Sequence, residues 1–230
     1  MLLDQKKLMS ESSWQAEYQQ HPYLVGGGIF QIEKLRVIPV FDRRDAVQTV
    51  LSVDKAGTED GDGAYTAIVL MHRLKDGRFV IERIVRGHWG ALEREKQIKQ
   101  WATHDRENLK RISSRFTVVI EQEPGSGGKE SAEATIRNLA GFTCIADKPG
   151  ANRSKEVRAE PFAAQCQGGN VYLVAQYPNW IPDFLEEAEA FPAGPHKDQI
   201  DAAAQAFHHL TATKGYDISI WRKANRGEDA

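Results

Sequence analysis

The strongest constraint on the fold is a series of three apolar, β-branched segments between residues 47 and 89. They are VQTVLSVD (47–54), AYTAIVLMHRL (64–74) and FVIERIVRGHW (79–89). Between them lie AGTEDGDG, which is rich in turn-forming residues, and KDGR, which contains the Asp-Gly pair of tight hairpins. Strands joined by such short turns pair with each other, so we expect an antiparallel meander of three strands.

Beyond residue 90, helix-like and strand-like segments alternate. Helical patterns of charged and apolar residues cover 91–112, 129–141, 155–169, 180–191 and 198–211, and strand-like runs cover 116–123, 142–147 and 171–175. A meander followed by alternating strands and helices predicts one α/β domain with a mixed sheet. In that sheet the later strands run parallel, and helices flank its faces.

The two ends of the chain differ from this regular middle. Residues 1–45 contain scattered aromatic residues and three consecutive glycines, Gly26–Gly28. We expect a short helix over residues 1–20, followed by irregular chain with brief strands, together forming an arm or linker outside the core. The polar end predicts a tail over residues 213–230, which leaves residues 46–212 for the domain.

Composition excludes several classes of protein. No apolar run approaches the ~20 residues of a membrane span, and the first residues lack the pattern of a secretory signal. Two cysteines do not make a disulfide framework, so a reducing cytoplasm is the expected setting. The net charge is −2, so any contact with nucleic acid must use a local basic patch or a further domain for grip.

Acidic residues stand where strongly apolar elements end or begin. Asp54 ends the first strand, Glu121 ends the strand-like run after residue 116, and Asp198 and Asp201 open the last helix. Sites in open α/β sheets gather where strands end, and carboxylates are hard oxygen ligands suited to Mg²⁺ or Mn²⁺. Two such ions ~3.5–4 Å apart can activate water and stabilise the leaving oxygen of a phosphodiester. Each acid alone also fits a solvated turn or a helix cap, so the combination is what points to a metal site.

A helical projection separates the two late aspartates. If the helix begins near Asp198, then at about 100° per residue its apolar side chains share one face. They are Ile200, Ala203, Ala204, Phe207 and Leu210. Asp201 lies at the edge of this face and can reach toward the strand ends. Asp198 lies nearly opposite, and we expect it to bind a second ion or to stay solvated.

Four motifs resemble, in the same order, the C-terminal nuclease domain of the large terminase subunit of tailed bacteriophages. They are SVDKAGTEDGDGAYTA (52–67), VVIEQEPGSGGK (118–129), RAEPFAAQCQGGNVYLV (158–174) and FPAGPHKDQIDAAAQAF (191–207). The resemblance covers about residues 30–211 and implies an RNase H-like fold, which is compatible with the predicted order of elements. It also implies an endonuclease in the bacterial host cytoplasm, using two Mg²⁺ or Mn²⁺ ions to cut double-stranded concatemeric DNA during packaging.

The same resemblance implies a role for each acid. Asp54 matches the metal-bridging aspartate of the first strand, Glu121 the acid that closes the fourth strand, and Asp201 the aspartate of the final helix. Asp198 would be an accessory metal ligand. Glu123 falls past the strand end, and Asp62, in the loop after the first motif, would assist through water.

Family members also carry an N-terminal ATPase motor, whose Walker motifs this sequence lacks. GSGGKES (125–131) fails the phosphate-loop pattern, because Glu123 and Glu130 stand where Gly and Ser or Thr are required. WQAEYQQHP (14–22) resembles the stretch that closes the ATPase domain. We therefore expect the nuclease half of a large terminase with its linker, from a fragment, a split gene or a prophage remnant. The expected partners are DNA, the portal protein, the small terminase subunit and a separate ATPase domain.

Four basic residues near the acidic motifs are candidates for contacts with DNA phosphates: Lys129, Lys155, Arg158 and Lys197. A solvated charged surface explains each of them equally well. Two other functions stay open at this point. One is another RNase H-like nuclease of the resolvase or transposase type, and the other is a non-catalytic module that docks on the packaging motor.

Overall fold

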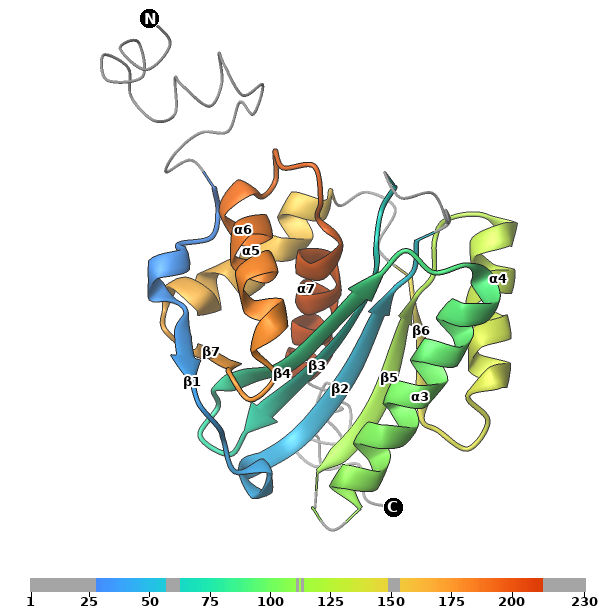
Figure 1. The fold of residues 1–230 in the computed structure, drawn as a ribbon, viewed down its shortest axis with the longest axis horizontal. Coiled ribbons are helices and arrows are strands. Elements are labelled where there is room, and N and C mark those ends of the chain that lie inside the picture. Colours follow the sequence, from blue (N-terminus) through green and yellow to red (C-terminus); the bar gives the residue numbers. More distant parts are fainter. Residues whose placement is uncertain (1–27, 57–62, 111, 113, 149–153, 213–230) are drawn as a thin grey trace, which may run out of the picture.

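A seven-stranded sheet forms the centre of the molecule, with the order β1-β7-β4-β3-β2-β5-β6 (Figure 1). The computed structural model describes residues 28–56, 63–110, 112, 114–148 and 154–212, so the predicted helix over residues 1–20, Asp62 and the predicted tail lie outside the described residues. The strands are β1 (Arg36–Ile38), β2 (Ala46–Asp54), β3 (Thr66–Leu74), β4 (Phe79–Gly87), β5 (Arg115–Glu121), β6 (Cys144–Asp147) and β7 (Val171–Val174).

The pairing of these strands is the predicted mixed pattern. β2, β3 and β4 form an antiparallel meander, whereas β5 pairs parallel with β2 and β6, and β7 pairs parallel with β4 and β1. The prediction of an α/β fold with a meander plus parallel strands is confirmed.

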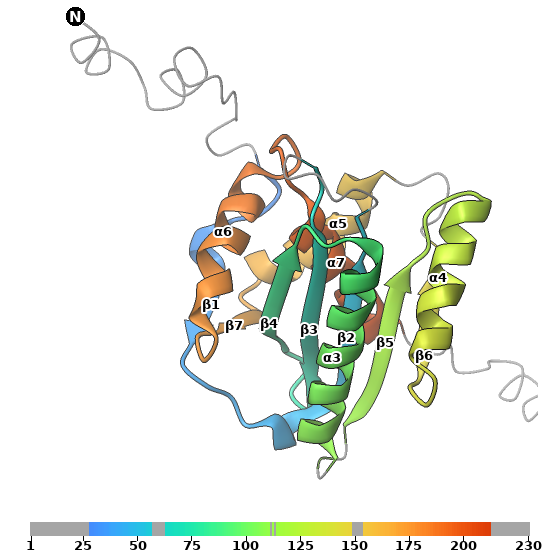
Figure 2. The same cartoon turned by 45° about the vertical axis from the view of Figure 1, so that its right-hand side comes forward.

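Helices cover both faces of the sheet (Figures 1 and 2). α3 (Ala91–Leu109) and α4 (Ser126–Asn138) lie on one face, and α5 (Lys155–Gln167), α6 (Ile181–Ala190) and α7 (Asp198–Thr211) lie on the other. Short 3₁₀ turns cover Ile32–Lys34, Arg43–Asp45 and Pro178–Trp180. From β2 onward, the order of strands and helices is the one that the sequence predicts.

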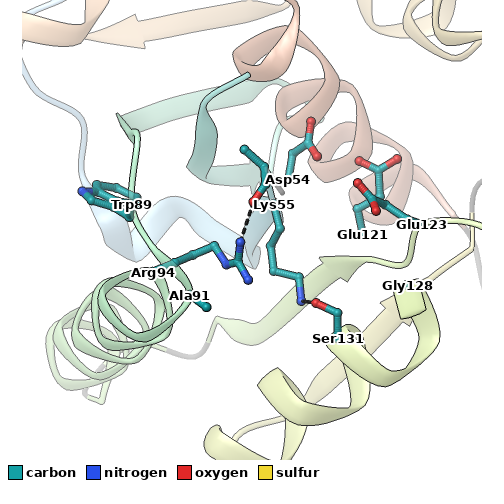
Figure 3. Close-up of a pocket in the computed structure, with 10 residues that line it drawn as sticks. Asp54, Lys55, Trp89, Ala91, Arg94, Glu121, Glu123, Gly128 and Ser131 are labelled. Atoms are coloured by element: carbon teal, nitrogen blue, oxygen red, sulfur yellow. Dashed lines mark hydrogen bonds between the residues drawn. The ribbon is translucent and has the colours of Figure 1, made fainter. Parts of the chain in front are cut away.

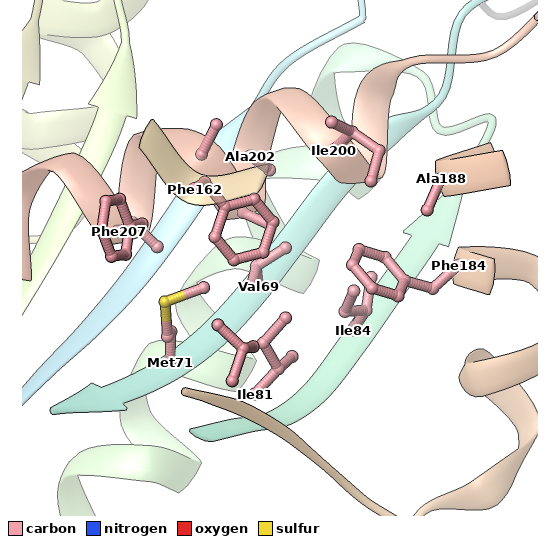
Figure 4. Close-up of a cluster of buried hydrophobic side chains, with 14 of the residues drawn as sticks. Val69, Met71, Ile81, Ile84, Phe162, Phe184, Ala188, Ile200, Ala202 and Phe207 are labelled. Carbon is pink, nitrogen blue, oxygen red and sulfur yellow. The ribbon is translucent and has the colours of Figure 1, made fainter. Parts of the chain in front are cut away.

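The central strands are apolar throughout because each of their faces meets helices. Successive side chains of a strand point to opposite faces. Val69 and Met71 of β3 therefore pack toward α5, α6 and α7 (Figure 4), while Ile68 and Leu70 pack in a second cluster with residues of α3 and α4. A strand buried on both faces reads as a continuous apolar run, and the two cores hold the strand ends in fixed positions.

Two boundaries differ from the expectation. Residues 28–45 were expected outside the core, but Phe30 and Leu35 are buried in it and β1 extends the sheet by pairing with β7. The three residues of β1 are too few to give a strand signal of their own, so β1 forms only because β7 lies beside it to pair with. Helix α4 begins at Ser126, inside the predicted PGSGGK loop, because the glycines that suggested a loop are tolerated in a first helical turn.

In the described part of the chain, none of the helices combines the length and the apolar character that are required to cross a membrane.

Candidate metal and nuclease site

Adjacent strands bring acidic side chains into one row at the edge of the sheet. The last registered pair of β2 and β5 is Val53 with Ile120, so Asp54 and Glu121 stand side by side one residue further on. Asp54 and Glu121 point to the face covered by α7, because the residue two positions before each of them does so. Ser52 donates a hydrogen bond to α7, and Val119 packs in the core on that side. Two acids from separate segments of the chain are therefore fixed by strand register.

Helix α7 supplies the third acid. It begins at Asp198, as the projection assumed, and packs across β2 and β3. Asp201 lies in its first turn, and its side chain is 3 % exposed. Its charge acts on Asp54, which places the two carboxylates in one electrostatic cluster. The structure thus brings together Asp54, Glu121 and Asp201, which we call the acid cluster.

Burial and the charges of neighbouring acids raise the pKa of Asp54 and of Asp201. Burial raises the pKa of Asp54 well above its ordinary value, and the neighbouring charges of Glu121 and Asp201 raise it further. Burial also raises the pKa of Asp201, although Lys155 and Arg158 oppose the shift. Carboxylates crowded in this way favour either protonation or a bound cation.

Two basic side chains of α5 contact the acid cluster directly. The Lys155 ammonium is ion-paired with Asp201 Oδ2, and Arg158 Nη1 lies 3.3 Å from Glu121 Oε1. Both were expected to contact DNA phosphates. In the structure their partners are two of the three acids.

A cavity of about 150 Å³ opens beside Asp54 and Glu121, between the first turns of α3 and α4. Figure 3 shows Lys55 extending across it toward Ser131, with Glu121 and Glu123 close together on one side and Arg94 on the other. The residues before α3 and α4 are glycines, Gly90 and Gly125. Helix N-termini and basic side chains next to carboxylates suit a negatively charged group that is bound together with a cation.

Lys55 was not selected from the sequence, although it directly follows the first acidic residue. Its Nζ donates hydrogen bonds to Ser131 Oγ at 2.6 Å and to Thr135 Oγ1 at 3.0 Å. Burial and the nearby Arg94 guanidinium lower its pKa to about 8, although Glu95 acts in the opposite direction. Lys55 therefore ties the end of β2 to α4 and places a positive charge in the cavity.

Asp198 has a different environment from the one expected. It is 8 % exposed and accepts a hydrogen bond of 2.8 Å from the backbone N–H of Tyr65. The first ten residues of α7 are all buried, because α7 packs on the sheet and against α5 and α6. The expectation of a solvated Asp198 is therefore wrong, and its role as an accessory metal ligand stays a prediction.

Asp147 is a fourth acid that the sequence analysis missed. It stands opposite Glu121 in the register of β5 and β6. Gln205 of α7 donates to it at 3.2 Å and accepts from Ser52 of β2, and His209 lies 3.5 Å away. The sequence contains a signal for Asp147, because FTCIAD (142–147), like the strands that end at Asp54 and Glu121, is an apolar run that ends in an acid.

The remaining basic candidates, Lys129 and Lys197, have other contacts. Lys129 is exposed on α4 and lies 3.7 Å from Glu133. Lys197 precedes α7, and its backbone oxygen accepts from the Asp201 N–H. Contact with DNA stays a prediction for both.

The acid cluster fits a hard divalent cation by its chemistry. Its donors are carboxylate oxygens, which suit Mg²⁺ or Mn²⁺. The pKa values of Asp54 and Asp201 are raised above all by burial, so a bound cation would stabilise their ionised forms. Among the described residues, no three acidic, histidine or cysteine side chains converge closely enough to ligate one ion as they stand. Ligation therefore requires side-chain rearrangement.

Comparison with known proteins identifies the family of this fold. The family model described as the terminase RNase H-like domain matches residues 51–210. No curated protein matches the chain.

Among solved structures, three nuclease domains are similar in fold. The large terminase nuclease from thermophilic phage G20c with bound magnesium is 15 % identical with a TM-score of 0.53, over 78 % of this chain and 96 % of that one. The Thermus phage P74-26 large terminase nuclease domain is 14 % identical with a TM-score of 0.52, over 83 % and 99 %. The human cytomegalovirus terminase nuclease domain, soaked with manganese, is 11 % identical with a TM-score of 0.54, over 77 % and 90 %.

At these identities the solved structures show a shared fold. The match to the RNase H-like family model confirms the predicted RNase H-like architecture. The family model spans all three acids of the cluster. On this match over most of its length, the chain belongs to the terminase RNase H-like domain family.

Proposed function

We propose that this protein is a metal-dependent endonuclease that cuts double-stranded concatemeric phage DNA during genome packaging. The observation that carries the proposal is the meeting of Asp54, Glu121 and Asp201, from β2, β5 and α7, beside a cavity with basic side chains. Terminase nucleases of the same fold, one with bound magnesium and one soaked with manganese, support it.

Asp54, Glu121 and Asp201 would hold two Mg²⁺ or Mn²⁺ ions, with Asp198 as an accessory ligand. When bound, two such ions activate water and stabilise the leaving oxygen of a phosphodiester. Asp54 would give up the proton that its raised pKa favours. Lys55 and Arg94 would orient the phosphodiester by their charge in the cavity, since the pull of buried cations on phosphate is weakly screened.

Contacts with the DNA backbone are proposed for Lys129, Lys155, Arg158 and Lys197. The net charge of −2 argues for weak binding by this domain alone. We therefore propose that a separate ATPase domain supplies grip and movement, with the portal protein and the small terminase subunit as further partners.

The test is nicking of supercoiled plasmid with Mn²⁺ by wild type, Asp54→Asn, Glu121→Gln and Asp201→Asn. We expect each variant to lose roughly 100- to 1,000-fold of the rate, the scale seen when a group that stabilises a transition state is removed. Glu133→Gln is the matched control, because Glu133 is an exposed acid on the outer surface of α4. Equal rates in wild type and all variants would exclude the proposed site, and strong preference for branched over linear DNA would favour a resolvase-type enzyme.

A further inference from the structure

Helix α5 presents two cations to the acid cluster from one face. Lys155 and Arg158 are three residues apart, so their side chains project on the same side of the helix. Lys155 is ion-paired with Asp201, and Arg158 with Glu121 at 3.3 Å. Since α5 packs against α7, both cations reach carboxylates that belong to other elements.

The two members of each pair differ in how firmly they are held. The Asp201 side chain is 3 % exposed, and its short stem stands in the buried first turn of α7. The Lys155 side chain is 46 % exposed and has four rotatable carbon–carbon bonds. Arg158 is likewise more exposed than Glu121, at 23 % against 12 %. The cations can therefore leave by side-chain rotation, whereas the acids stay.

A divalent ion competes with these cations for the same oxygens. Asp201 Oδ2 and Glu121 Oε1 are both engaged by α5. A metal ion on either carboxylate would also repel an ammonium or guanidinium at hydrogen-bond distance. The two states of the site, with α5 cations or with metal, therefore exclude each other.

We propose that Lys155 and Arg158 are built-in counter-ions of the acid cluster, which yield its carboxylates to a divalent metal and then become available to bind DNA phosphates. The inference rests on the proposed function, because it takes Asp54, Glu121 and Asp201 as the metal ligands. In this proposal metal binding and DNA binding strengthen each other. The metal binds the carboxylates that the broken ion pairs release, and the DNA phosphates bind the released cations.

The first test is calorimetric titration of Mn²⁺ into the metal-free full chain without DNA. Lys155→Gln and Arg158→Gln remove the competing charges, so we expect Mn²⁺ to bind on the order of tenfold more tightly to each. Lys155→Arg keeps the charge, and Lys96→Gln removes an exposed charge on α3 that pairs with Glu93 instead, so both should match wild type. Circular dichroism confirms folding, and having two positions guards against one unfolded variant. Unchanged or weaker Mn²⁺ binding in both folded Gln variants would overturn the counter-ion role.

The second test measures binding of a linear DNA duplex by fluorescence anisotropy, with and without Ca²⁺, a hard cation with oxygen ligands. We expect Ca²⁺ to strengthen binding by wild type much more than by the double variant Lys155→Gln/Arg158→Gln. With Ca²⁺, the logarithmic salt dependence should also be shallower in the double variant, by about one phosphate contact per removed cation. An equal effect of Ca²⁺ on both proteins would overturn the coupling to DNA.

Neither measurement depends on cleavage. A protein that fails to nick plasmid while its Gln variants bind Mn²⁺ more tightly would contradict the proposed function and support the counter-ions. A protein that nicks plasmid, but whose Gln variants bind Mn²⁺ no more tightly than wild type, would do the reverse.

Discussion

Gly128 illustrates how single positions shape the site. It lies in the first turn of α4, and a Cβ there would stand 2.1 Å from the backbone oxygen of Glu123. The chain can pass from Glu121 past Glu123 into α4 so tightly only because residue 128 lacks a side chain. Gly127, its neighbour in the same turn, has no such contact, since nothing lies within 4 Å of an added Cβ.

We therefore expect Gly128→Ala to lower stability by roughly 1–3 kcal/mol and to reduce plasmid nicking, because the backbone of Glu123 must move. Gly127→Ala is the matched control and should stabilise the protein by about 0.5–1 kcal/mol, as Ala replaces Gly inside a helix. Urea unfolding and the nicking assay compare the two. A Gly128→Ala protein as stable and as active as Gly127→Ala would contradict this account.

Individual site residues were predictable to different degrees. The 100° periodicity of the last helix favours Asp201 over Asp198, whereas the preference for Glu121 over Glu123 comes from the resemblance to terminase nuclease domains. The burial of Asp198 was not predictable, because it depends on the packing of α7 against the sheet, α5 and α6, and its hydrogen bond comes from the backbone N–H of Tyr65 in a distant loop. The α5 ion pairs were hidden for the same reason, since the packing of α5 on α7 sets them.

Elements were predictable where a local pattern specifies them. The meander follows from its turns, and the alternation after residue 90 follows from periodicity. β1 was not, because its three residues join the sheet only through β7. A buried network between β3 and β4 was also missed: His72 Nε2 lies 2.9 Å from Glu82 Oε2, and Arg43 pairs with the same carboxylate.

This network yields a prediction about acid stability. Burial alone would raise the pKa of Glu82, but hydrogen bonds from His72 and Arg43 outweigh it and lower the pKa to about 2, from 4.5. Because the folded pKa lies below the unfolded one, the stabilisation is present above about pH 4.5 and is lost as the pH falls toward 2. Glu82→Gln should therefore cost roughly 3 kcal/mol at pH 7, with a smaller deficit near pH 2.

The measurement is urea unfolding of both proteins between pH 2 and pH 7. Asp76→Asn is the control, because Asp76 pairs with Arg78 on the exposed hairpin and such surface pairs contribute little. A deficit of Glu82→Gln that stays constant across this range would show that the charge of Glu82 is not what stabilises the fold.

At the scale of the whole molecule, the acid cluster opposes folding when no metal is bound. The pKa of Asp54 is higher in the folded chain than its ordinary value of 3.8. A carboxyl of this kind contributes stability that is fully present below the ordinary value and is lost as the pH rises through the folded pKa. Near neutral pH, the metal-free protein therefore bears the free-energy cost of this raised pKa, and a bound cation offsets that cost.

We therefore expect Asp54→Asn to raise the melting temperature of the metal-free protein at pH 7 by roughly 2–4 °C, the shift of about 1 kcal/mol in a chain of this size. Below pH 3.8 the gain should vanish, since Asp54 is then protonated. Asp147→Asn, on the neighbouring strand β6, is a contrasting control. Burial would raise the pKa of Asp147, but His209 and Gln205 lower it, so loss of its charge should not stabilise the protein at pH 7.

Mn²⁺ at 100 times its Kd should stabilise wild type by about 2.7 kcal/mol and Asp54→Asn by much less. Scanning calorimetry at both pH values decides the matter. A lower melting temperature for metal-free Asp54→Asn at pH 7 would mean that the carboxylate stabilises the fold, and the acid cluster would then not need a cation.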